Sequence, residues 1–370
     1  MEGVDVIIVG GGIAGLSAAH ALVRAGAGKV RLLEREPVLC AHSSGRNAAI
    51  FRHLSTGLGD LATALRSRAL ATELLGAEEA WLRRTGTWFV AATREALEPL
   101  ARLAAGERLR AEPAEGKGLD AALPGLRGGA ARHGLFFAED GVIDLHALTQ
   151  GLARASVAAG TTVSLAEPVA RIDARAGRVE GVTLLSGERL AAGAVVVAGG
   201  AWSGLLGAGC GAPLALEPRR RHLALLETTD GAGAPSPVVW CVDDEVYLRP
   251  DSGGLLASPC DEEPWAAELP PPSDAGLELL GRKLARTAPK LADAAVRRVW
   301  ACLRTFAPDR AAAVGADPRA AGLYWIAGLG GHGMTGGLAA GELLAACVTG
   351  RAHPLKDALA PARLVAVERD

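Results

Sequence analysis

The hydrophobic and polar positions of residues 1–35 follow the order strand, turn, helix and strand. Residues 4–9 are mostly β-branched and apolar, as in a strand that is buried on both faces. Residues 13–25 are rich in Ala and Leu and predict a helix, and residues 29–35 (KVRLLER) predict a second short strand. The pattern therefore predicts a βαβ unit in this part of the chain.

The following 170 residues carry less regular patterns. Helical periodicity dominates from about residue 60 to 84, and a strand-like run follows at 86–91. The Ala-, Arg- and Glu-rich stretch up to about residue 131 is expected to contain helices whose ends the pattern does not define. Asp144 is expected to cap a helix that continues to residue 160. Short alternating runs then predict strands, the last of which is the apolar run AGAVVVAGGAW at 192–202.

Beyond residue 215 the pattern changes to a sheet with a helix. Residues 219–260 alternate strand and turn and predict an antiparallel sheet, and residues 274–287 predict an amphipathic helix. A strand containing ACLRTF (301–306), a strand at 323–328, a glycine-rich turn and a helix from about 335 to 348 complete the prediction.

This order of elements predicts an α/β protein, α+β overall, with two domains, because 370 residues exceed one ordinary core. The α/β pattern lies at both ends and in the middle, so an insertion explains the order better than two consecutive domains. We expect a discontinuous Rossmann-type cofactor domain of residues 1–85, 140–218 and 307–370. The inserted antiparallel-sheet domain, which would bind the substrate, is expected at 86–139 and 219–306.

Composition narrows the classes of partner. The net charge is −2 and no dense Lys/Arg stripe occurs, so nucleic acid is not expected as a partner and small molecules are. The six cysteines are far apart and form no CxxC pair, which argues against a metal site or a disulfide framework and predicts a cytoplasmic location. Three consecutive glycines interrupt the apolar start, so no integral membrane segment is expected there.

The turn after the first strand has the spacing of a dinucleotide fingerprint. Gly10, Gly12 and Gly15 form GxGxxG between the predicted strand and helix, and Glu34 closes the second strand. The glycines allow a tight turn, close approach to a pyrophosphate and close helix–strand packing, and the helix N-terminus attracts phosphate charge. Glu34 is placed to accept hydrogen bonds from a ribose and would repel a 2′-phosphate. NAD and FAD therefore remain as candidates, and NADP is disfavoured.

Two further features favour FAD over NAD. The apolar strand at 192–202 ends in Gly199 and Gly200, a form that resembles the second dinucleotide-contacting strand of two-domain flavoproteins. A glycine turn at 328–333 leads into a second helix N-terminus, which would stabilise negative charge on a reduced flavin. A nicotinamide enzyme has no evident need for that second helix.

The ACLRTF run places chemistry on one face of a strand. Residues two apart share a face, so Cys302 and Arg304 should look toward the same surface. If that surface is the flavin cleft, the planar guanidinium of Arg304 suits bidentate binding of a carboxylate.

Seven motifs together resemble the D-amino acid oxidase superfamily of FAD-dependent amine oxidoreductases, which includes glycine oxidase, sarcosine oxidase and D-arginine dehydrogenase. They are VIIVGGGIAGLSAAHAL, HSSGRNAA, DGVIDLHAL, VVVAGGAWS, YLRPDSGGLLASP, CLRTFAPD and GLGGHGMTGG. The resemblance runs from end to end but is weak from about residue 90 to 135. It implies a flavin domain roofed by a sheet domain, with the substrate between them.

The resemblance also implies a reaction. A neutral amino group would assist transfer of the Cα hydride to flavin N5, giving an imino acid that water hydrolyses to an oxo acid and ammonia. We therefore expect oxidative deamination of an α-amino acid, D or achiral and possibly N-substituted, with oxygen or another electron acceptor. The same resemblance implies that Arg304 and Tyr247 bind the substrate carboxylate, with Arg221 and His332 nearby.

The predicted cofactor-binding residues combine the motifs with the resemblance. They are Gly10, Gly12, Ile13, Ala14, Gly15, Glu34, Arg35, Ser43, Ser44, Gly45, Arg46, Val169, Gly199, Gly200, Trp202, Gly330, Gly331, His332, Gly333, Met334 and Thr335. No metal is expected. FAD is expected to be bound non-covalently, although Cys302 and Thr305 reproduce the Cys-x-x-Thr spacing of the sarcosine oxidase flavin link, which leaves a covalent bond at Cys302 as a minority alternative.

The chain departs from D-arginine dehydrogenase at two pocket positions. Ile50 and Phe51 stand where that enzyme has a histidine, and Thr335 stands where it has a glutamine. Both changes predict a less polar pocket, so a neutral or apolar amino acid or a secondary amine is as compatible as a basic one.

Two alternatives to amine oxidation stay open. A flavin-dependent 2-hydroxy acid dehydrogenase on the same fold would need a strong base, for which His332 is the candidate near the flavin edge. A flavin-binding redox sensor without catalysis would have no use for the carboxylate-binding residues Arg304 and Tyr247.

Overall fold

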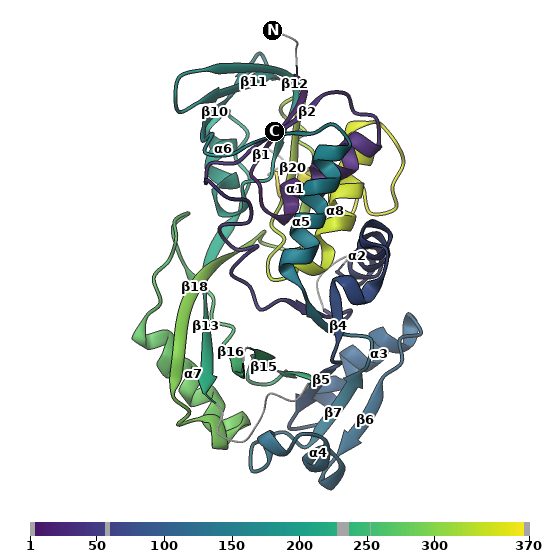
Figure 1. Ribbon diagram of the computed structural model, residues 1–370, viewed down its shortest axis with the longest axis vertical. Coiled ribbons are helices and arrows are strands. Elements are labelled where there is room, and N and C mark those ends of the chain that lie inside the picture. The colour runs from purple at the N-terminus through teal and green to yellow at the C-terminus, as the bar shows by residue number, and fades with distance from the viewer. Residues whose placement is uncertain (1–3, 56–59, 228–236, 252, 366–370) are drawn as a thin grey trace, which may run out of the picture.

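The computed structural model describes residues 4–55, 60–227, 237–251 and 253–365. Two large sheets organise these residues, and Figure 1 shows one in the upper part of the molecule and the other in the lower part. The predicted domain ranges also include residues 1–3, 56–59, 228–236, 252 and 366–370, which lie outside the described residues.

The upper sheet has a parallel centre. Its parallel strands lie in the order β20, β12, β1, β2 and β9. Their bounds are β1 Val4–Val9, β2 Val30–Leu33, β9 Thr162–Ser164, β12 Arg189–Val197 and β20 Leu323–Ala327. Three antiparallel strands extend this sheet: β10 Val169–Arg175, β11 Arg178–Leu184 and β19 Ala313–Ala316. Because the central strands are parallel, their carboxyl ends meet at one edge, where ligands of α/β sheets bind.

Helices cover both faces of this sheet. On one face lie α1 (Ile13–Arg24), α5 (Leu145–Ala158), α8 (Gly333–Val348) and, against α8, α2 (Asp60–Leu75). On the other, α6 (Ser203–Gly209) and the β10–β11 hairpin enclose a second apolar cluster. The alternation of buried apolar strands with Ala- and Leu-rich helices accounts for both cores, since each strand buries side chains on its two faces.

Helices α1 and α8 pack at very short range. A Cβ atom added at Gly341 of α8 would lie 2.5 Å from the backbone carbon of Ser17 in α1. A Cβ added at Gly337, one turn earlier, would lie 3.0 Å from the Ile13 side chain. The absence of these two side chains lets the helices touch along their length and brings their N-termini together.

The lower sheet contains nine strands from two separate parts of the chain. Eight lie in the order β17, β13, β16, β15, β14, β5, β7 and β6, and β18 pairs with β13. Their bounds are β5 Thr87–Ala91, β6 Glu112–Glu115, β7 His133–Phe137, β13 Glu217–Glu227, β14 Val238–Cys241, β15 Val246–Asp251, β16 Gly254–Ser258, β17 Glu263–Pro264 and β18 Val296–Phe306. The sheet carries α3 (Glu98–Gly106), α4 (Lys117–Ala122) and α7 (Asp274–Thr287).

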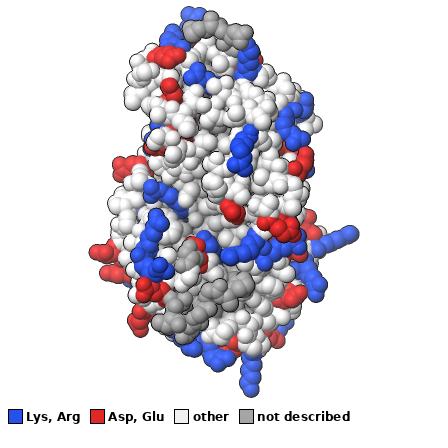
Figure 2. Space-filling view, in the orientation of Figure 1, with Lys and Arg blue, Asp and Glu red and all other residues white. Residues whose placement is uncertain are grey.

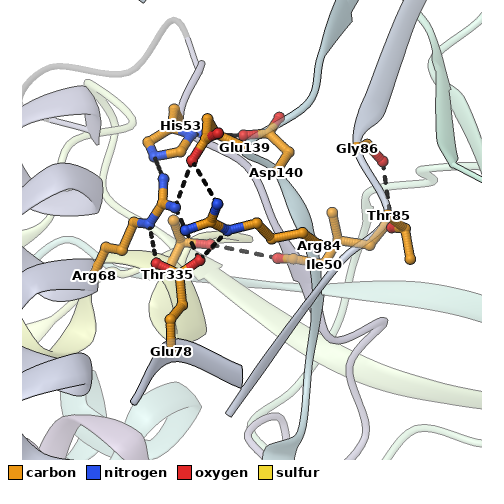
Figure 3. Close-up of polar contacts among 10 residues, drawn as sticks. All are labelled: Ile50, His53, Arg68, Glu78, Arg84, Thr85, Gly86, Glu139, Asp140 and Thr335. Carbon is orange, nitrogen blue, oxygen red and sulfur yellow. Dashed lines mark hydrogen bonds and ion pairs between the residues drawn. The ribbon is translucent and has the colours of Figure 1, made fainter. Parts of the chain in front are cut away.

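A small third sheet and an ion-pair network join the two parts. Strands β3 (Ile50–Phe51) and β4 (Leu82–Arg84) flank β8 (Gly141–Ile143). Behind them the ring Nδ1 of His53 is 2.7 Å from Asp140 Oδ1, and its Nε2 is 3.1 Å from Arg68 (Figure 3). Arg68 and Arg84 in turn share the carboxylate of Glu78. The network ties the chain that follows β3 to helix α2 and to β4.

Most predicted elements are found, with three differences. The helical stretch predicted at 60–84 ends at Leu75, and a short 3₁₀ helix (Glu78–Ala80) and strand β4 follow it. The stretch before residue 131 contains a strand, β6, besides its helices. In the predicted antiparallel sheet, β14 runs parallel to β5, because the two come from distant segments and no hairpin fixes their direction.

The visible surface shows no concentration of either charge. Figure 2 shows Lys and Arg interspersed with Asp and Glu over this face. Within the described residues, no helix combines the length and apolar character needed to cross a membrane. In the same part of the chain, no group of three or more His, Cys, Asp and Glu side chains is placed to hold a metal ion.

The contact between α1 and α8 should be sensitive to a single methyl group. Replacing Gly341 with Ala places a Cβ against the Ser17 backbone, so we expect a loss of about 1–3 kcal/mol in the free energy of unfolding, measured in urea. As a control, a Cβ at Gly281 of α7 meets no atom within 4 Å, and Gly281→Ala should raise stability by about 0.5–1 kcal/mol. Equal stability of the two variants would show that the helices can separate without cost.

Candidate functional site

A cavity of about 1000 Å³ lies between the two sheets. Its upper wall comes from the carboxyl ends of β1, β2, β12 and β20, and its lower wall from β13, β14, β15 and β18. Most of the predicted site residues line it: Gly10, Gly12, Ile13, Ala14, Glu34, Arg35, Ser43, Ser44, Val169, Gly199, Gly200, Trp202, Arg221, Tyr247, Arg304, Gly330, Gly331, His332, Gly333, Met334 and Thr335.

The first glycine turn forms one end of this cavity. Gly10 has a φ of +114°, and a Cβ there would lie 2.5 Å from the carbonyl oxygen of Ala198. Only glycine combines that backbone conformation with so close an approach. Helix α1 begins at Ile13 with Gly12 as its N-cap, so no side chain of its own caps it; Ser44 Oγ accepts a hydrogen bond from the Ile13 amide at 3.0 Å. The positive end of α1 therefore faces the cavity.

Glu34 lies beside this turn and is almost fully buried, with 7% of its surface exposed. Its Oε2 accepts a hydrogen bond from the Gly11 amide at 2.6 Å, and its Oε1 accepts one from the Glu36 amide at 2.8 Å. Each oxygen keeps a further lone pair for a ligand hydroxyl. Next to it, the guanidinium of Arg35 lies 3.8 Å from the ring centroid of Trp202, and both residues line the cavity.

The second glycine turn also lies at this end of the cavity, on the side opposite the first. A Cβ at Gly330, which has a φ of +54°, would lie 2.7 Å from the Phe306 ring. Helix α8 then begins at Gly333 with His332 as its N-cap and no side-chain capping hydrogen bond. Two helix N-termini thus point their free amides toward one cavity, an arrangement suited to a ligand that carries negative charge at two places.

These features fit FAD. The turn at Gly10 and Gly12 with the α1 amides suits a pyrophosphate, Glu34 suits a ribose, and the α8 N-terminus suits the negative edge of a reduced flavin. The cavity is long enough to be lined by residues of both glycine turns and of the lower sheet.

Three predicted cofactor residues are outside the cavity and have packing roles. A Cβ at Gly15 would lie 1.8 Å from the Gly10 carbonyl oxygen, and one at Gly45 would lie 2.4 Å from that of Cys40. Arg46 Nε donates a hydrogen bond to the Ala41 carbonyl oxygen at 3.2 Å. These residues shape the two loops and do not line the space for the ligand.

Arg304 lies in the lower wall with 7% of its surface exposed. Its Nη1 is 2.9 Å from Cys302 Sγ and donates to the Leu303 carbonyl oxygen at 3.1 Å. No carboxylate of the described residues forms an ion pair with it. A buried guanidinium without a counter-ion is costly, so this arginine is prepared to bind an anion from the cavity.

Tyr247 lies in the same wall and stacks on Trp240, with ring centroids 5.1 Å apart. Burial raises the pKa of the Tyr247 phenol to about 12. The hydroxyl therefore stays protonated at neutral pH and can donate a hydrogen bond to an anion.

Arg221 also reaches the cavity, whereas its neighbours Arg219 and Arg220 do not line it. Its Nη2 is 2.8 Å from Glu262 Oε1, and the same carboxylate binds both terminal nitrogens of Arg310 at 2.6 and 2.8 Å. Arg221 is thus partly neutralised within the protein, and its ability to bind a further anion is lower than that of Arg304.

His332 is held in one protonation state by its neighbours. Its Nε2 accepts a hydrogen bond from Arg52 Nη2 at 2.9 Å, and its Nδ1 is 3.5 Å from Asp60 Oδ2. Desolvation and then the nearby Arg52 charge lower the pKa of His332 to about 4. The imidazole is therefore neutral at physiological pH, and its basic nitrogen is already occupied.

Several cavity residues were missed in the sequence, chiefly Arg52, Asp60, Trp240 and Glu262. Arg52 follows the small apolar strand β3, and a charged residue there was the one available signal. The other three lie on segments whose position relative to the cavity depends on tertiary packing. The expectation of a less polar pocket rested on Ile50 and Thr335 and did not take into account the charge of Arg52, which also lines the cavity.

Cys302 is buried behind Arg304 and is not among the residues that line the cavity. Its thiol donates a hydrogen bond to the Arg46 carbonyl oxygen at 3.3 Å. This placement is typical of cysteine as a small residue that is readily buried.

Solved structures with this fold include two enzymes. L-proline dehydrogenase from P. horikoshii superposes with a TM-score of 0.86 at 22% identity, covering 98% of each chain. Glycine oxidase from Geobacillus kaustophilus superposes with a TM-score of 0.82 at 24% identity, covering 98% of this chain and 99% of that one. Both likenesses confirm the predicted fold class.

Comparisons of the sequence point to the same class of protein as the structural likenesses. D-amino acid dehydrogenase of Methylobacterium sp. (strain 4-46) is 32% identical over 250 residues, which are 66% of this chain and 55% of the relative. The chain spans about half the length of the curated relatives it matches. The family model described as FAD dependent oxidoreductase (DAO) matches residues 5–347. That match covers nearly the whole chain and confirms both the predicted resemblance and the cofactor: this protein belongs to the DAO family of FAD-dependent oxidoreductases.

Proposed function

We propose that this protein catalyses the oxidative deamination of an α-amino acid, D or achiral and possibly N-substituted, to an oxo acid and ammonia, or to an oxo acid and the corresponding amine when the nitrogen is substituted. The observation that carries the proposal is the buried, unpaired guanidinium of Arg304 in the cavity wall. A carboxylate is the ligand that such a planar fork binds best. The names of relatives, which include D-amino acid dehydrogenase and glycine oxidase, support the same class of substrate.

In this proposal the lower wall orients the substrate. Arg304 binds the substrate carboxylate through two hydrogen bonds, and the protonated phenol of Tyr247 donates a third. FAD, when bound along the upper wall, supplies the acceptor for the hydride lost from Cα. The protein's own contribution is to hold Cα–H in one orientation and to exclude water, which strengthens each charge interaction in the cavity.

We also propose that the two sheets mark two domains. Residues 1–85, 140–218 and 307–370 would hold FAD, and residues 86–139 and 219–306 would hold the substrate. Non-covalent FAD is favoured over a link at Cys302, whose thiol lies outside the cavity lining. A cytoplasmic location stays a prediction, and oxygen and other electron acceptors remain alternatives.

The geometry of His332 disfavours the hydroxy acid alternative. Removing a hydroxyl proton requires a free basic nitrogen, but Nε2 of His332 accepts a hydrogen bond from Arg52. A neutral amine needs no such base. A non-catalytic flavin sensor is disfavoured for another reason, since it would have no use for the buried cation of Arg304.

The substrate class can be tested by mixing the FAD-loaded protein with D- and L-amino acids, glycine, N-methylglycine and 2-hydroxy acids without oxygen. We expect at least one amine to bleach the visible flavin absorbance. Bleaching by 2-hydroxy acids alone would support the dehydrogenase alternative, and no bleaching by any amine would rule out the proposal. Repeating the reaction in air with a peroxide assay separates oxygen from other acceptors.

Removal of the Arg304 charge should weaken the reaction of every amino acid substrate. For Arg304→Met we expect kcat/KM to fall by about 30-fold or more, since breaking a buried charge pair costs about 2–5 kcal/mol. FAD content should be unchanged. Arg219→Met is the matched control, because Arg219 pairs with Glu217 and does not line the cavity. If both variants keep wild-type kcat/KM, Arg304 does not bind the substrate.

The pH dependence of kcat/KM should contain no ionisation of His332. Its pKa of about 4 keeps it neutral from about pH 5 to 8, so activity should rise only as the substrate ammonium loses its proton. His332→Gln keeps an acceptor for Arg52 and should leave the shape of the profile unchanged. A general-base role would instead remove one limb of the profile in this variant and abolish most of the activity.

A further inference from the structure

Arg52 is a second cation of the cavity without a counter-ion. It follows β3, lines the cavity and is partly buried. Its Nη2 donates to His332 Nε2 at 2.9 Å, and its guanidinium lies 3.9 Å from the ring centroid of Trp240. No carboxylate of the described chain forms an ion pair with it. Its two protein partners are a neutral ring and an aromatic face, and neither cancels its charge.

Among the described residues, the carboxylates nearest to Arg52 contact other groups and form no ion pair with it. Glu262 is shared between Arg221 and Arg310, so it neutralises one of two cations. Asp60 approaches the other ring nitrogen of His332, at 3.5 Å, and is not paired with Arg52. With the α-carboxylate of an amino acid on Arg304, Arg52 would still have no carboxylate in direct contact, and Asp60 acts on it only from a longer distance.

The remaining ionisable groups near Arg52 do not supply the missing charge. Asp140 accepts hydrogen bonds from the backbone amide and the ring of His53 and is committed to the network of Figure 3. The thiol of Cys260 is buried, which raises its pKa and keeps it neutral. Desolvation also lowers the pKa of Arg52, as expected for a cation that lacks an anionic partner.

The backbone that carries Arg52 is fixed on both sides. Ile50 pairs with Val142 of β8, and its carbonyl oxygen is 3.5 Å from Thr335 Oγ1 (Figure 3). His53, directly after Arg52, is held between Asp140 and Arg68. Arg52 is thus presented to the cavity by a rigid segment, which reduces the entropy lost when it binds a ligand.

We propose that Arg52 binds a second carboxylate of the substrate, so that this protein acts on amino acids with two carboxylates, the second on the side chain or on the nitrogen substituent. This rests on the function proposed above and narrows its substrate. Arg304 binds the carboxylate next to the reacting carbon, and Arg52, backed by Trp240, binds the other.

A binding experiment tests the subsite without turnover. The FAD-loaded protein is titrated by calorimetry with glutarate and with butyrate, which have no amine to oxidise. We expect glutarate to bind about 10- to 100-fold more tightly, the ratio for one added hydrogen-bonded charge. In Arg52→Gln this ratio should fall to about one. Equal binding of the two acids by the wild-type protein would overturn the proposal.

A reaction experiment uses matched substrates. Glutamate is compared with glutamine and aspartate with asparagine, in both configurations, and iminodiacetate is compared with N-methylglycine. We expect the acid of at least one pair to reduce the flavin with a kcat/KM about 10- to 100-fold above its neutral partner. Arg52→Gln should remove that preference by lowering kcat/KM for the acid far more than for its neutral partner, whereas Arg304→Met should lower both by a similar factor.

The outcomes separate this proposal from the one on which it rests. If neutral amino acids react and no acid is preferred, only the second carboxylate site is wrong. If no amino acid reacts, the proposed function fails, but the glutarate titration still reports on Arg52.

Arg83→Gln, which changes an exposed arginine of β4 outside the cavity lining, controls for loss of surface charge. Arg52→Lys, which keeps the charge, should retain part of the preference if Arg52→Gln folds poorly.

Discussion

The contact between helices α1 and α8 is the constraint on which the arrangement of the site depends. Gly341 lets α8 touch the backbone of Ser17, and Gly337 leaves room for Ile13 at the start of α1. Two helix N-termini repel each other through their partial positive charges, so they are held together by packing. An anionic ligand between them relieves that repulsion. FAD should therefore stabilise the fold as well as supply its redox chemistry, because a ligand that binds only the native state shifts the folding equilibrium toward it.

The two sheets contribute opposite kinds of surface to the cavity. The upper wall contains the glycine turns and the backbone amides of two helix N-termini, which can approach a large cofactor closely. The lower wall carries long side chains, above all Arg304, Tyr247 and Trp240, whose charge and shape select a small molecule. Variation in substrate within such a fold can thus occur in the lower wall without disturbing the cofactor. Arg52 is an exception, since it comes from the segment next to the upper part and still faces the lower wall.

Sequence patterns were sufficient for what depends on local chemistry. The helix at 274–287 was predicted with its correct bounds, and Asp144 caps α5 as expected, although α5 ends at Ala158 and not at residue 160. The glycine turns were assigned to the cavity that they line. What could not be predicted depends on distant contacts. The strand β4 was hidden in a helical pattern, because its pairing with β8 overrides local propensity. Arg52 could not be distinguished from a surface arginine, since its place is decided by Trp240 and His332.

The parallel pairing of β5 with β14 has a consequence for the order in which the chain can fold. Thr87 lies opposite Val238, and all of β9 to β13 lies between them in the sequence. The lower sheet therefore closes by bringing together two distant segments of the chain, and the loop entropy of that closure must be overcome. Such non-local pairing makes folding slow. We expect the pairing of β5 with β14, which closes the lower wall of the cavity, to form later than the local hairpins β14–β15 and β15–β16 of the same sheet.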